Sequence, residues 1–529
     1  MARSDSGWTL PLALGALAVV VAAAGVQPWG PAMNDPDSMS SVLYFQRLAA
    51  GHRLEVTVLT TPKPLLTLVQ GLTWTLTHDW RALVWETVLV HGMGVALLAR
   101  LAARAAGAVA AAAVAVMLIA SASQLQEVSQ ANSLVWSLAA WAAAGVAVTA
   151  PRPRYWLAGV ALAVGGMARH ETWVLVAVLT VLTACVALLS LARRAPGVRE
   201  ASTWPSAREL APLLVGWIAV PVQLLHDLLL SGDALYWSKA SVAYTALVTP
   251  DLAPVPPVRF ALNVLERYAA MPLLVALALI GVAYLVVERR WAILLGLGWV
   301  TIGIAAMLGL LSWRAVYVTD RYFEQPTLGL VLAAAIGLGA LAHAMAVWIG
   351  AGRGITGRWG SVAAALAAGL IALALVPPWP MDAALRGRLT SMRAAVANLE
   401  SVMPRLRDVA APLRDGPAPP PRTVTGGFTE VDAQRAGLVV PRPFQRRIAI
   451  DLDLPLTVVA DSRVAFTAAP AATVLQPGQW VFHDAYVDTP PELFTVLEVD
   501  QATRLGGVEI TPVEWRAGAY WLLQVARVQ

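Results

Sequence analysis

The chain has 529 residues, of which 58% are hydrophobic and 13% are charged, whereas soluble chains carry about 25% charged residues. Its formal net charge is +5, and the basic residues are spread over short loops instead of forming the stripe that binds nucleic acid. These values exclude an ordinary soluble enzyme, a disordered chain and a nucleic-acid-binding protein. They predict a polytopic protein whose main partner is the lipid bilayer.

Apolar windows predict an all-α membrane domain over residues 1–379 with about eleven transmembrane helices. A long outer loop, 29–81, separates the first two spans, and its apolar segment 64–78 is predicted to lie at the membrane surface because it is too short to cross. The predicted spans are 8–28, 82–99, 107–123, 132–149, 154–168, 171–192, 210–230, 268–287, 291–311, 326–350 and 359–377.

The loop charges indicate the orientation, because cytoplasmic loops carry an excess of Lys and Arg. With the N-terminus inside, the inner pieces hold 13 basic and four acidic residues, while the outer side, without the tail, holds 10 basic and 13 acidic ones. We therefore expect a cytoplasmic N-terminus and an extracytoplasmic C-terminal region.

Residues 380–529 have a different composition, since 31 of these 150 residues are charged against 40 of the preceding 379. Apolar residues recur at helical spacing over 382–413, interrupted by Pro404, and strand-like stretches follow within 422–529. The pattern predicts a C-terminal extracytoplasmic α+β domain, helical over 382–413 and β-rich over 422–529. The strand-like stretches are 446–454, 479–487, 493–499 and 520–528.

Ionisable residues near apolar spans are costly and are candidates for function. Here they gather at the predicted outer ends of the spans, which favours a polar cavity that opens outward; the alternative is a wetted outer interface. A transporter more often places such groups near the midplane. They are Asp35, Asp37, Asp79, Glu86, Arg169, His170, Glu171, His226, Asp227, Asp233, Lys239, Asp320, Arg321 and Glu324.

The first outer loop resembles the GT-C superfamily of integral membrane glycosyltransferases, especially the lipid A aminoarabinose transferases and the protein O-mannosyltransferases. Those enzymes have one or two acidic residues about fifteen positions before a glycine, followed by a Lys-Pro element. Asp37 lies fourteen positions before Gly51, with Asp35 nearby, and Lys63-Pro64 follows. Here Pro36 separates the two acids, and the second proline of the Lys-Pro-Pro-like element is missing.

Later segments extend the resemblance over about the first 350 residues. The segment GGMARHETW, with Arg169, His170 and Glu171, is similar to an Arg-x-Glu turn of bacterial members. LLSGDALYWSKAS, which contains Trp237 and Lys239, is similar to a Gly-Asp-Pro-Leu-Tyr-Ser loop, with Ala234 in place of the proline. YVTDRYFEQPTLGL, with Arg321 and Tyr322, resembles an Arg-Tyr-Leu-x-Pro element.

The resemblance implies an inverting transferase of the bacterial inner membrane, active in cell-envelope biosynthesis, that moves a sugar from a polyprenyl-phosphate donor to an extracytoplasmic acceptor glycan, lipid or protein. Asp37 or Asp35 is then the base that takes a proton from the acceptor hydroxyl. Lys63, Arg321 and Arg169 are the residues expected to bind the donor phosphate, whose charge grows as the bond breaks. His170, Glu171, Tyr322, Lys239 and Trp237 are further substrate-binding candidates.

Several alternatives stay open. Asp35 and Asp37 are also a candidate pair for a divalent cation, Mg or Mn, because hard ions prefer carboxylates. A transporter or flippase of lipid-linked sugars uses the same outward basic groups, and an O-antigen-type polymerase or ligase is a third class. The residues do not separate mannose, arabinose, glucose and aminoarabinose.

Overall fold

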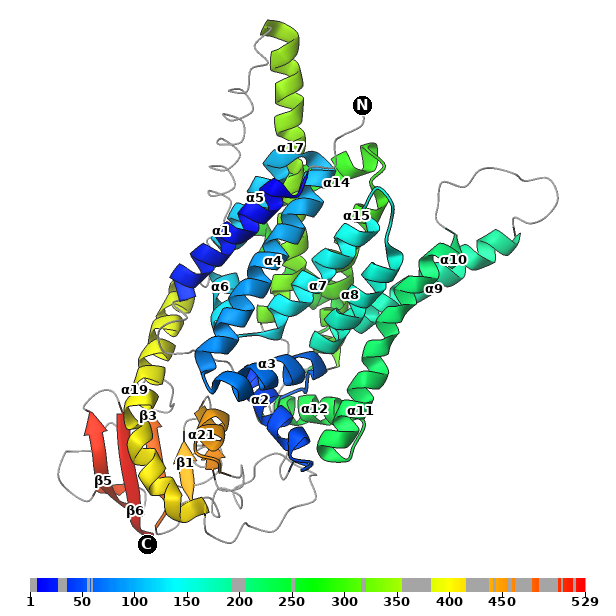
Figure 1. Cartoon of the computed structure of the whole chain (residues 1–529). Helices are drawn as coiled ribbons and strands as arrows, with labels where there is room; N and C mark the ends of the chain where they lie inside the picture. Colours follow the sequence, from blue (N-terminus) through cyan, green and yellow to red (C-terminus); the bar gives the residue numbers. More distant parts are fainter. Residues whose placement is uncertain are drawn as a thin grey trace.

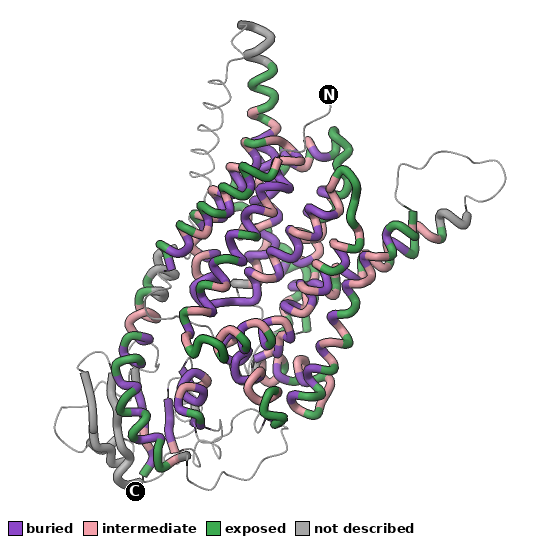
Figure 2. Tube along the Cα trace, viewed as in Figure 1, coloured by how far each residue is buried: buried purple, intermediate pink, exposed green. Residues whose placement is uncertain are grey.

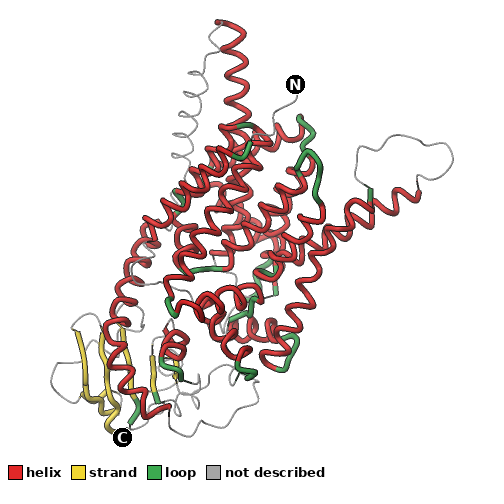
Figure 3. Tube along the Cα trace, viewed as in Figure 1, coloured by secondary structure: helices red, strands yellow, loops and turns green. Residues whose placement is uncertain are grey.

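The computed structural model describes residues 7–26, 36–54, 58, 60–192, 206–248, 253–314, 320–353, 382–414, 437–440, 444–454, 459–461, 478–484, 503–505, 508–516 and 520–528. These residues form a helical bundle with a six-stranded sheet near one end of it, which we call the sheet end (Figure 1). Figure 3 shows the same division, with helices throughout the bundle and strands beyond it.

The first part of the bundle contains α1 (Thr9–Val26), α2 (Pro36–Ala49), α3 (Pro64–Thr77), α4 (Trp80–Ala106), α5 (Ala108–Ile119), α6 (Ala122–Ser129), α7 (Ser133–Val148), α8 (Tyr155–Ala168) and α9 (Glu171–Ala192). The second part contains α10 (Ala207–Leu210), the 3₁₀ helix η1 (Ala211–Ile218), α11 (Ala219–Ser231), α12 (Tyr236–Val248), α13 (Pro257–Ala269), α14 (Pro272–Val287), α15 (Trp291–Gly298), the π-helical η2 (Trp299–Gly303), α16 (Ile304–Trp313), the 3₁₀ helix η3 (Asp320–Phe323) and α17 (Glu324–Arg353).

Ten of the predicted spans coincide with helices, and the eleventh, 359–377, lies outside the described residues. Among the described helices, length and hydropathy qualify six as membrane spans, or up to eight when bent pairs count as one span each. The bent pairs are α5 with α6, at 61°, and α13 with α14, at 100°, while α7 and α8 are shorter apolar helices. The chain is therefore a multi-pass membrane protein.

Small residues allow the spanning helices to pack closely. A Cβ atom built at Gly281 of α14 would lie 2.0 Å from the carbonyl oxygen of Ala333 in α17, and one at Gly337 of α17 would lie 2.1 Å from that of Leu277. Any side chain at either position would push the two helices apart, and close backbone approach is how helices gain contact in lipid. Figure 2 shows buried residues concentrated in the middle of the bundle.

The segment predicted to lie at the membrane surface forms α3. Figure 1 shows α3 running across the sheet end of the bundle, whereas α4, which follows it, runs along the bundle. Pro64 occupies the first helical position, where its missing N–H costs nothing. His78 ends α3 in the left-handed conformation (φ 49°), and Asp79 then caps α4 by accepting a hydrogen bond from the backbone N–H of Arg81.

The C-terminal region contains α19 (Asp382–Arg414), α21 (Gln445–Asp451) and six strands in the order β2-β1-β3-β6-β5-β4. β1 pairs in parallel with β2 and β3, and the other pairs are antiparallel. α19 continues through Pro404 and Pro412. The strands are β1 (Leu438–Val440), β2 (Val459–Asp461), β3 (Trp480–Asp484), β4 (Thr503–Leu505), β5 (Val508–Arg516) and β6 (Tyr520–Val528).

One strand prediction is wrong. The stretch 446–454 alternates apolar and polar residues, yet it begins as helix α21, in which Gln445, Arg447, Ile448, Ala449 and Ile450 are all buried. An element buried on almost every side gives no reliable periodicity, because its polar residues are covered as well. The stretches 479–487 and 520–528 contain β3 and β6, as expected, and 493–499 lies outside the described residues.

The sheet end of the bundle and the C-terminal region share one hydrophobic core. Met39 of α2, Leu230 of α11 and Tyr236 of α12 belong to the same buried cluster as Leu399 of α19 and Ile448 of α21. The C-terminal region is thus packed against the elements that form the candidate site.

Candidate active site

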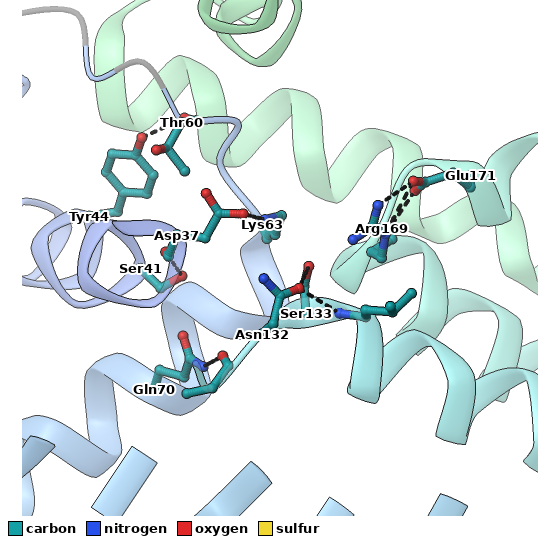
Figure 4. A network of polar contacts seen from close by, with 12 residues as sticks. Asp37, Ser41, Tyr44, Thr60, Lys63, Gln70, Asn132, Ser133, Arg169 and Glu171 are labelled. Atoms are coloured by element: carbon teal, nitrogen blue, oxygen red, sulfur yellow. Dashed lines mark hydrogen bonds and ion pairs between the residues drawn. The ribbon is translucent and has the colours of Figure 1, made fainter. Parts of the chain in front are cut away.

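Asp37 and Lys63 form an ion pair at the sheet end. Lys63 Nζ lies 2.7 Å from Asp37 Oδ2, and the two side chains are 11% and 23% exposed. Asp37 is in the first turn of α2, where the helix dipole favours a carboxylate. Lys63 is the extended residue directly before Pro64. Figure 4 shows the two side chains pointing toward one another, with Asn132 below Lys63 in this view.

Two tyrosines hold the segment that leads to Lys63. Tyr44 of α2 donates its hydroxyl hydrogen to the carbonyl oxygen of Thr60, at 2.7 Å. The Tyr236 hydroxyl accepts from the N–H of Val58, at 2.8 Å, and donates to the Val58 carbonyl oxygen, at 3.1 Å. Burial raises the pKa of both tyrosines, so both hydroxyls keep their hydrogen at neutral pH. These bonds fix the backbone before Lys63 and so limit where its ammonium group can reach.

A second ion pair joins Arg169, in the turn between α8 and α9, to Glu171. Arg169 Nη2 lies 2.6 Å from Glu171 Oε1, and Arg169 Nε lies 3.1 and 3.3 Å from the two carboxylate oxygens. Both side chains are largely buried, at 6% and 12% exposure. The Arg169 guanidinium carbon also lies 5.4 Å from the ring centre of Tyr322 in η3. Arg169 thus connects the α8–α9 turn to the start of α17.

A buried glutamine, Gln223 of α11, connects the two ion pairs. Its Nε2 donates to the carbonyl oxygen of Pro62, the residue before Lys63, at 3.3 Å, and to Asp227 Oδ1 at 2.7 Å. Its Oε1 lies 3.2 Å from Nε2 of His170, the residue between Arg169 and Glu171. Sequence reasoning missed Gln223, although a glutamine inside an otherwise apolar predicted span, 210–230, was a usable signal.

The remaining candidates from the sequence differ in whether the structure places them near the two ion pairs. Trp237 stacks on His170, with ring centres 4.8 Å apart, and therefore belongs to the same cluster. Lys239 is 70% exposed and pairs with Asp233, and no described contact links it to the two ion pairs. Arg321 belongs to η3 beside Tyr322, but its side chain lies outside the described part of the chain, as does Asp35.

Two other acidic residues at predicted outer ends have local partners. Asp79 caps α4 and pairs with Arg81 at 2.9 Å, while Glu86 accepts a hydrogen bond from Thr73 at 2.7 Å. The contact with Arg81 accounts for the Asp79 carboxylate, whereas Glu86 Oε1 is buried and has no hydrogen-bond partner among the described residues.

The described residues do not fit a divalent cation at Asp37. The Lys63 ammonium group already occupies Asp37 Oδ2, where a metal ion would be repelled by it. Within the described residues, moreover, no three His, Cys, Asp or Glu side chains come together as a ligand group. We therefore derive no chemical step through a metal.

The arrangement provides the groups that substitution at a phosphorylated carbon requires. Asp37 is a partly exposed carboxylate able to accept a proton, and Lys63 is a cation within reach of it. Arg169 is a second cation, connected to Lys63 through His170, Gln223 and Pro62. Cations held before the reaction stabilise negative charge that develops on a leaving group.

No family model and no curated protein matches the chain. Among solved structures, the chain is similar to the archaeal oligosaccharyltransferase AglB from Archaeoglobus fulgidus in complex with an inhibitory peptide and a dolichol-phosphate, with 11% identity, a TM-score of 0.49, and coverage of 90% of this chain and 69% of that one. It is also similar to ArnT from Cupriavidus metallidurans, in the apo state (TM-score 0.49) and bound to undecaprenyl phosphate (TM-score 0.48), each with 14% identity and 98% coverage of both chains.

Proposed function

We propose that the protein is an inverting glycosyltransferase that moves a hexosyl or pentosyl group from a polyprenyl-phosphate donor to an acceptor hydroxyl outside the cytoplasm. The observation that carries this proposal is the ion pair of Asp37 and Lys63, a base and a phosphate-binding cation held 2.7 Å apart at the sheet end. The pair comes from two elements 26 residues apart, α2 and the start of α3, so the fold and not local sequence brings it together.

In the proposed reaction, the acceptor oxygen attacks the anomeric carbon on the face opposite the phosphate. Asp37 takes the proton of the acceptor hydroxyl as the new carbon–oxygen bond forms. The bond from the anomeric carbon to the phosphate oxygen breaks, and polyprenyl phosphate leaves with the electron pair. A single displacement of this kind inverts the configuration at the anomeric carbon.

Lys63 changes partner during donor binding. Its ammonium group lies on Asp37 in the structure, and the donor phosphodiester offers it a single negative charge like that of the carboxylate, which increases as the bond to the anomeric carbon breaks. When Lys63 moves to the phosphate, Asp37 Oδ2 becomes available to the acceptor hydroxyl. Arg321 and Arg169 are proposed to share the phosphate, while His170, Glu171, Tyr322, Lys239 and Trp237 contact the substrates.

The proposed location is the bacterial inner membrane, with the sheet end outside the cytoplasm and a role in cell-envelope biosynthesis. The excess of arginine in the loops at the opposite end supports this orientation, through the positive-inside rule. Because nucleotide sugars are normally absent outside the cytoplasm, a lipid-linked donor is the sugar source that this orientation requires.

The test is the release of polyprenyl phosphate from labelled undecaprenyl-phosphate mannose, arabinose, glucose and aminoarabinose by the purified protein in nanodiscs, with a bacterial cell-envelope extract added as the source of acceptor hydroxyl groups. A glycosyltransferase releases polyprenyl phosphate from at least one of these donors and forms a glycoside of inverted configuration. A transporter or flippase moves the intact lipid and releases none.

A further inference from the structure

The orientation of the Gln223 side chain is determined by its neighbours. Gln223 is completely buried, and the carbonyl oxygen of Pro62 can only accept hydrogen bonds. The carboxylate oxygen Asp227 Oδ1, at 2.7 Å, also only accepts, and the two acceptors together turn the amide nitrogen toward Pro62 and Asp227. This leaves the amide oxygen Oε1 facing His170 Nε2 at 3.2 Å.

The amide orientation in turn fixes the tautomer of His170. Because Gln223 Oε1 can only accept, the hydrogen of the neutral imidazole must be on Nε2, and the lone pair is on Nδ1. Burial lowers the pKa of His170 to about 4 against the opposing effect of Glu171, so the ring is neutral at pH 7. The other charged groups facing the ring are Lys63 and Asp227.

Asp227 holds the Gln223 amide and the start of α12 in place through hydrogen bonds. The Asp227 side chain is completely buried. Its Oδ1 accepts a hydrogen bond from Gln223 and lies 3.3 Å from His226 Nδ1. Its Oδ2 accepts a hydrogen bond from the backbone N–H of Trp237 at 2.7 Å. Asp227 thus positions both the amide that orients His170 and the start of α12, which carries Trp237.

His170 and Trp237 form an aromatic cluster that has unused hydrogen-bonding groups. The rings of His170, Trp173 and Trp237 lie with centres 4.5 to 5.6 Å apart. Within the described residues, His170 Nδ1 has no hydrogen-bond partner, and Trp237 Nε1 is buried and has none either. The cluster thus contains one acceptor and one donor, both uncharged.

We propose that this cluster is the subsite for the sugar of the donor, in which His170 Nδ1 accepts a hydrogen bond from a sugar hydroxyl and Trp237 Nε1 donates one, with Gln223 and Asp227 as positioning residues. The inference rests on the proposed function. A hydroxyl group both donates and accepts, as these two atoms require, whereas a phosphodiester at pH 7 has no proton for Nδ1. The subsite adjoins both ion pairs, since Pro62 precedes Lys63 and His170 follows Arg169.

Asp227→Asn tests the positioning role. The asparagine must keep its oxygen toward the Trp237 N–H, which leaves its NH₂ group facing Gln223. The Gln223 amide then turns over, giving up its 3.3 Å bond to the Pro62 carbonyl oxygen in order to accept from the new NH₂ group. It presents its own NH₂ to His170 Nε2, which moves the imidazole hydrogen to Nδ1. In ¹⁵N NMR spectra of histidine-labelled protein, assigned with His170→Gln, we expect an Nε2–H tautomer in the wild type and an Nδ1–H tautomer in Asp227→Asn.

Ligand binding provides a readout that a purely structural role would not change. The relevant ligands are those of the four undecaprenyl-phosphate sugars that the wild type binds more tightly than undecaprenyl phosphate. We expect Asp227→Asn to weaken the binding of these sugar lipids about tenfold, which is the scale of one lost hydrogen bond. The affinity for undecaprenyl phosphate should stay unchanged. Asp79→Asn, at an exposed carboxylate that pairs with Arg81 at the start of α4, is the matched control and should change neither affinity.

His170→Gln covers the case in which Asp227→Asn fails to fold. The glutamine amide still reaches Gln223 but provides no acceptor at the position of Nδ1, so we expect the same sugar-specific loss. Equal affinity of the wild type for all sugar lipids and for the bare phosphate, or unchanged sugar binding in both variants, would overturn the subsite. If sugar binding responds as expected but no donor is cleaved, the subsite stands and the transferase proposal fails.

Discussion

Lys63 Nζ lies 2.7 Å from Asp37 Oδ2, so the residue expected to bind phosphate neutralises the residue expected to act as a base. The two roles therefore compete in the absence of donor. This relationship leads to opposite predictions for catalysis and for lipid binding when the aspartate loses its charge.

Asp37→Asn should lower turnover by about 10²-fold or more, the scale of lost general-base catalysis. The same variant should bind undecaprenyl phosphate more tightly than the wild type, because Lys63 no longer has to leave a carboxylate. Asp79→Asn, which alters the exposed Asp79–Arg81 pair, should change neither property. Weaker lipid binding in Asp37→Asn would contradict the competition, and an active Asp37→Asn with an inactive Asp35→Asn would move the base to Asp35.

Lys63→Ala and Arg321→Ala should each reduce turnover through the loss of one cation at the leaving phosphate. By analogy with single preorganised donors, the loss is about 2–4 kcal/mol of transition-state stabilisation, or about 30- to 1000-fold in rate. Arg81→Ala removes a basic residue that is 50% exposed and paired locally with Asp79, and serves as the control. Turnover rates are compared at equal amounts of membrane-inserted protein. A fully active Lys63→Ala would exclude Lys63 from the phosphate site.

Glu171→Gln should destabilise the protein, because it removes the carboxylate that lies 2.6 Å from the buried guanidinium of Arg169. Removal of one member of a buried pair costs about 3–5 kcal/mol. Asp79→Asn, which alters an exposed Arg–Asp pair of the same sequence spacing, should cost about 1 kcal/mol or less. Thermal unfolding in nanodiscs measures both, and equal Tm values would show that the Arg169–Glu171 pair contributes no net stability.

Trp80→Phe should loosen the C-terminal region. The Trp80 Nε1 hydrogen is donated to Asp451 Oδ1 at 2.8 Å, and phenylalanine retains the apolar contact but has no donor. A hydrogen bond to a charged group contributes about 1.5–3 kcal/mol. Limited proteolysis should therefore cleave residues 382–528 faster in Trp80→Phe than in Trp156→Phe, a substitution at a 59% exposed tryptophan. The same cleavage rate in both variants would argue against this contact.

The orientation can be tested with single cysteines in a Cys185→Ser background, since Cys185 is the only native cysteine. An impermeant thiol reagent added to intact cells should label His52→Cys, in the exposed segment after α2, and leave Arg152→Cys, in the exposed α7–α8 loop, unlabelled. The reverse pattern would place the sheet end in the cytoplasm and remove the basis for a lipid-linked donor.

The sequence predicts most spanning helices, because whether a segment spans the membrane depends on its hydropathy and length, and both are local properties of the sequence. It also identifies Asp37, Arg169 and Glu171 as candidates, since charges at span ends are conspicuous, and Lys63 through the resemblance of its Lys-Pro element. It does not predict that Lys63 pairs with Asp37, because that contact depends on how α2 packs against α3. Local periodicity likewise fails for α21, whose surroundings come from α2 and α19, more distant in the chain.

The core that joins the sheet end to the C-terminal region has a consequence for biogenesis. Met39 and Ile448 are buried in the same cluster, yet about four hundred residues of synthesis separate them. At about 5–20 residues per second, the apolar face of α2 waits about 20–80 s for its partners after it leaves the ribosome. During that interval a chaperone or the membrane surface must cover the part of α2 that packs against α21, and chains that terminate before α21 keep that part exposed to quality-control proteases.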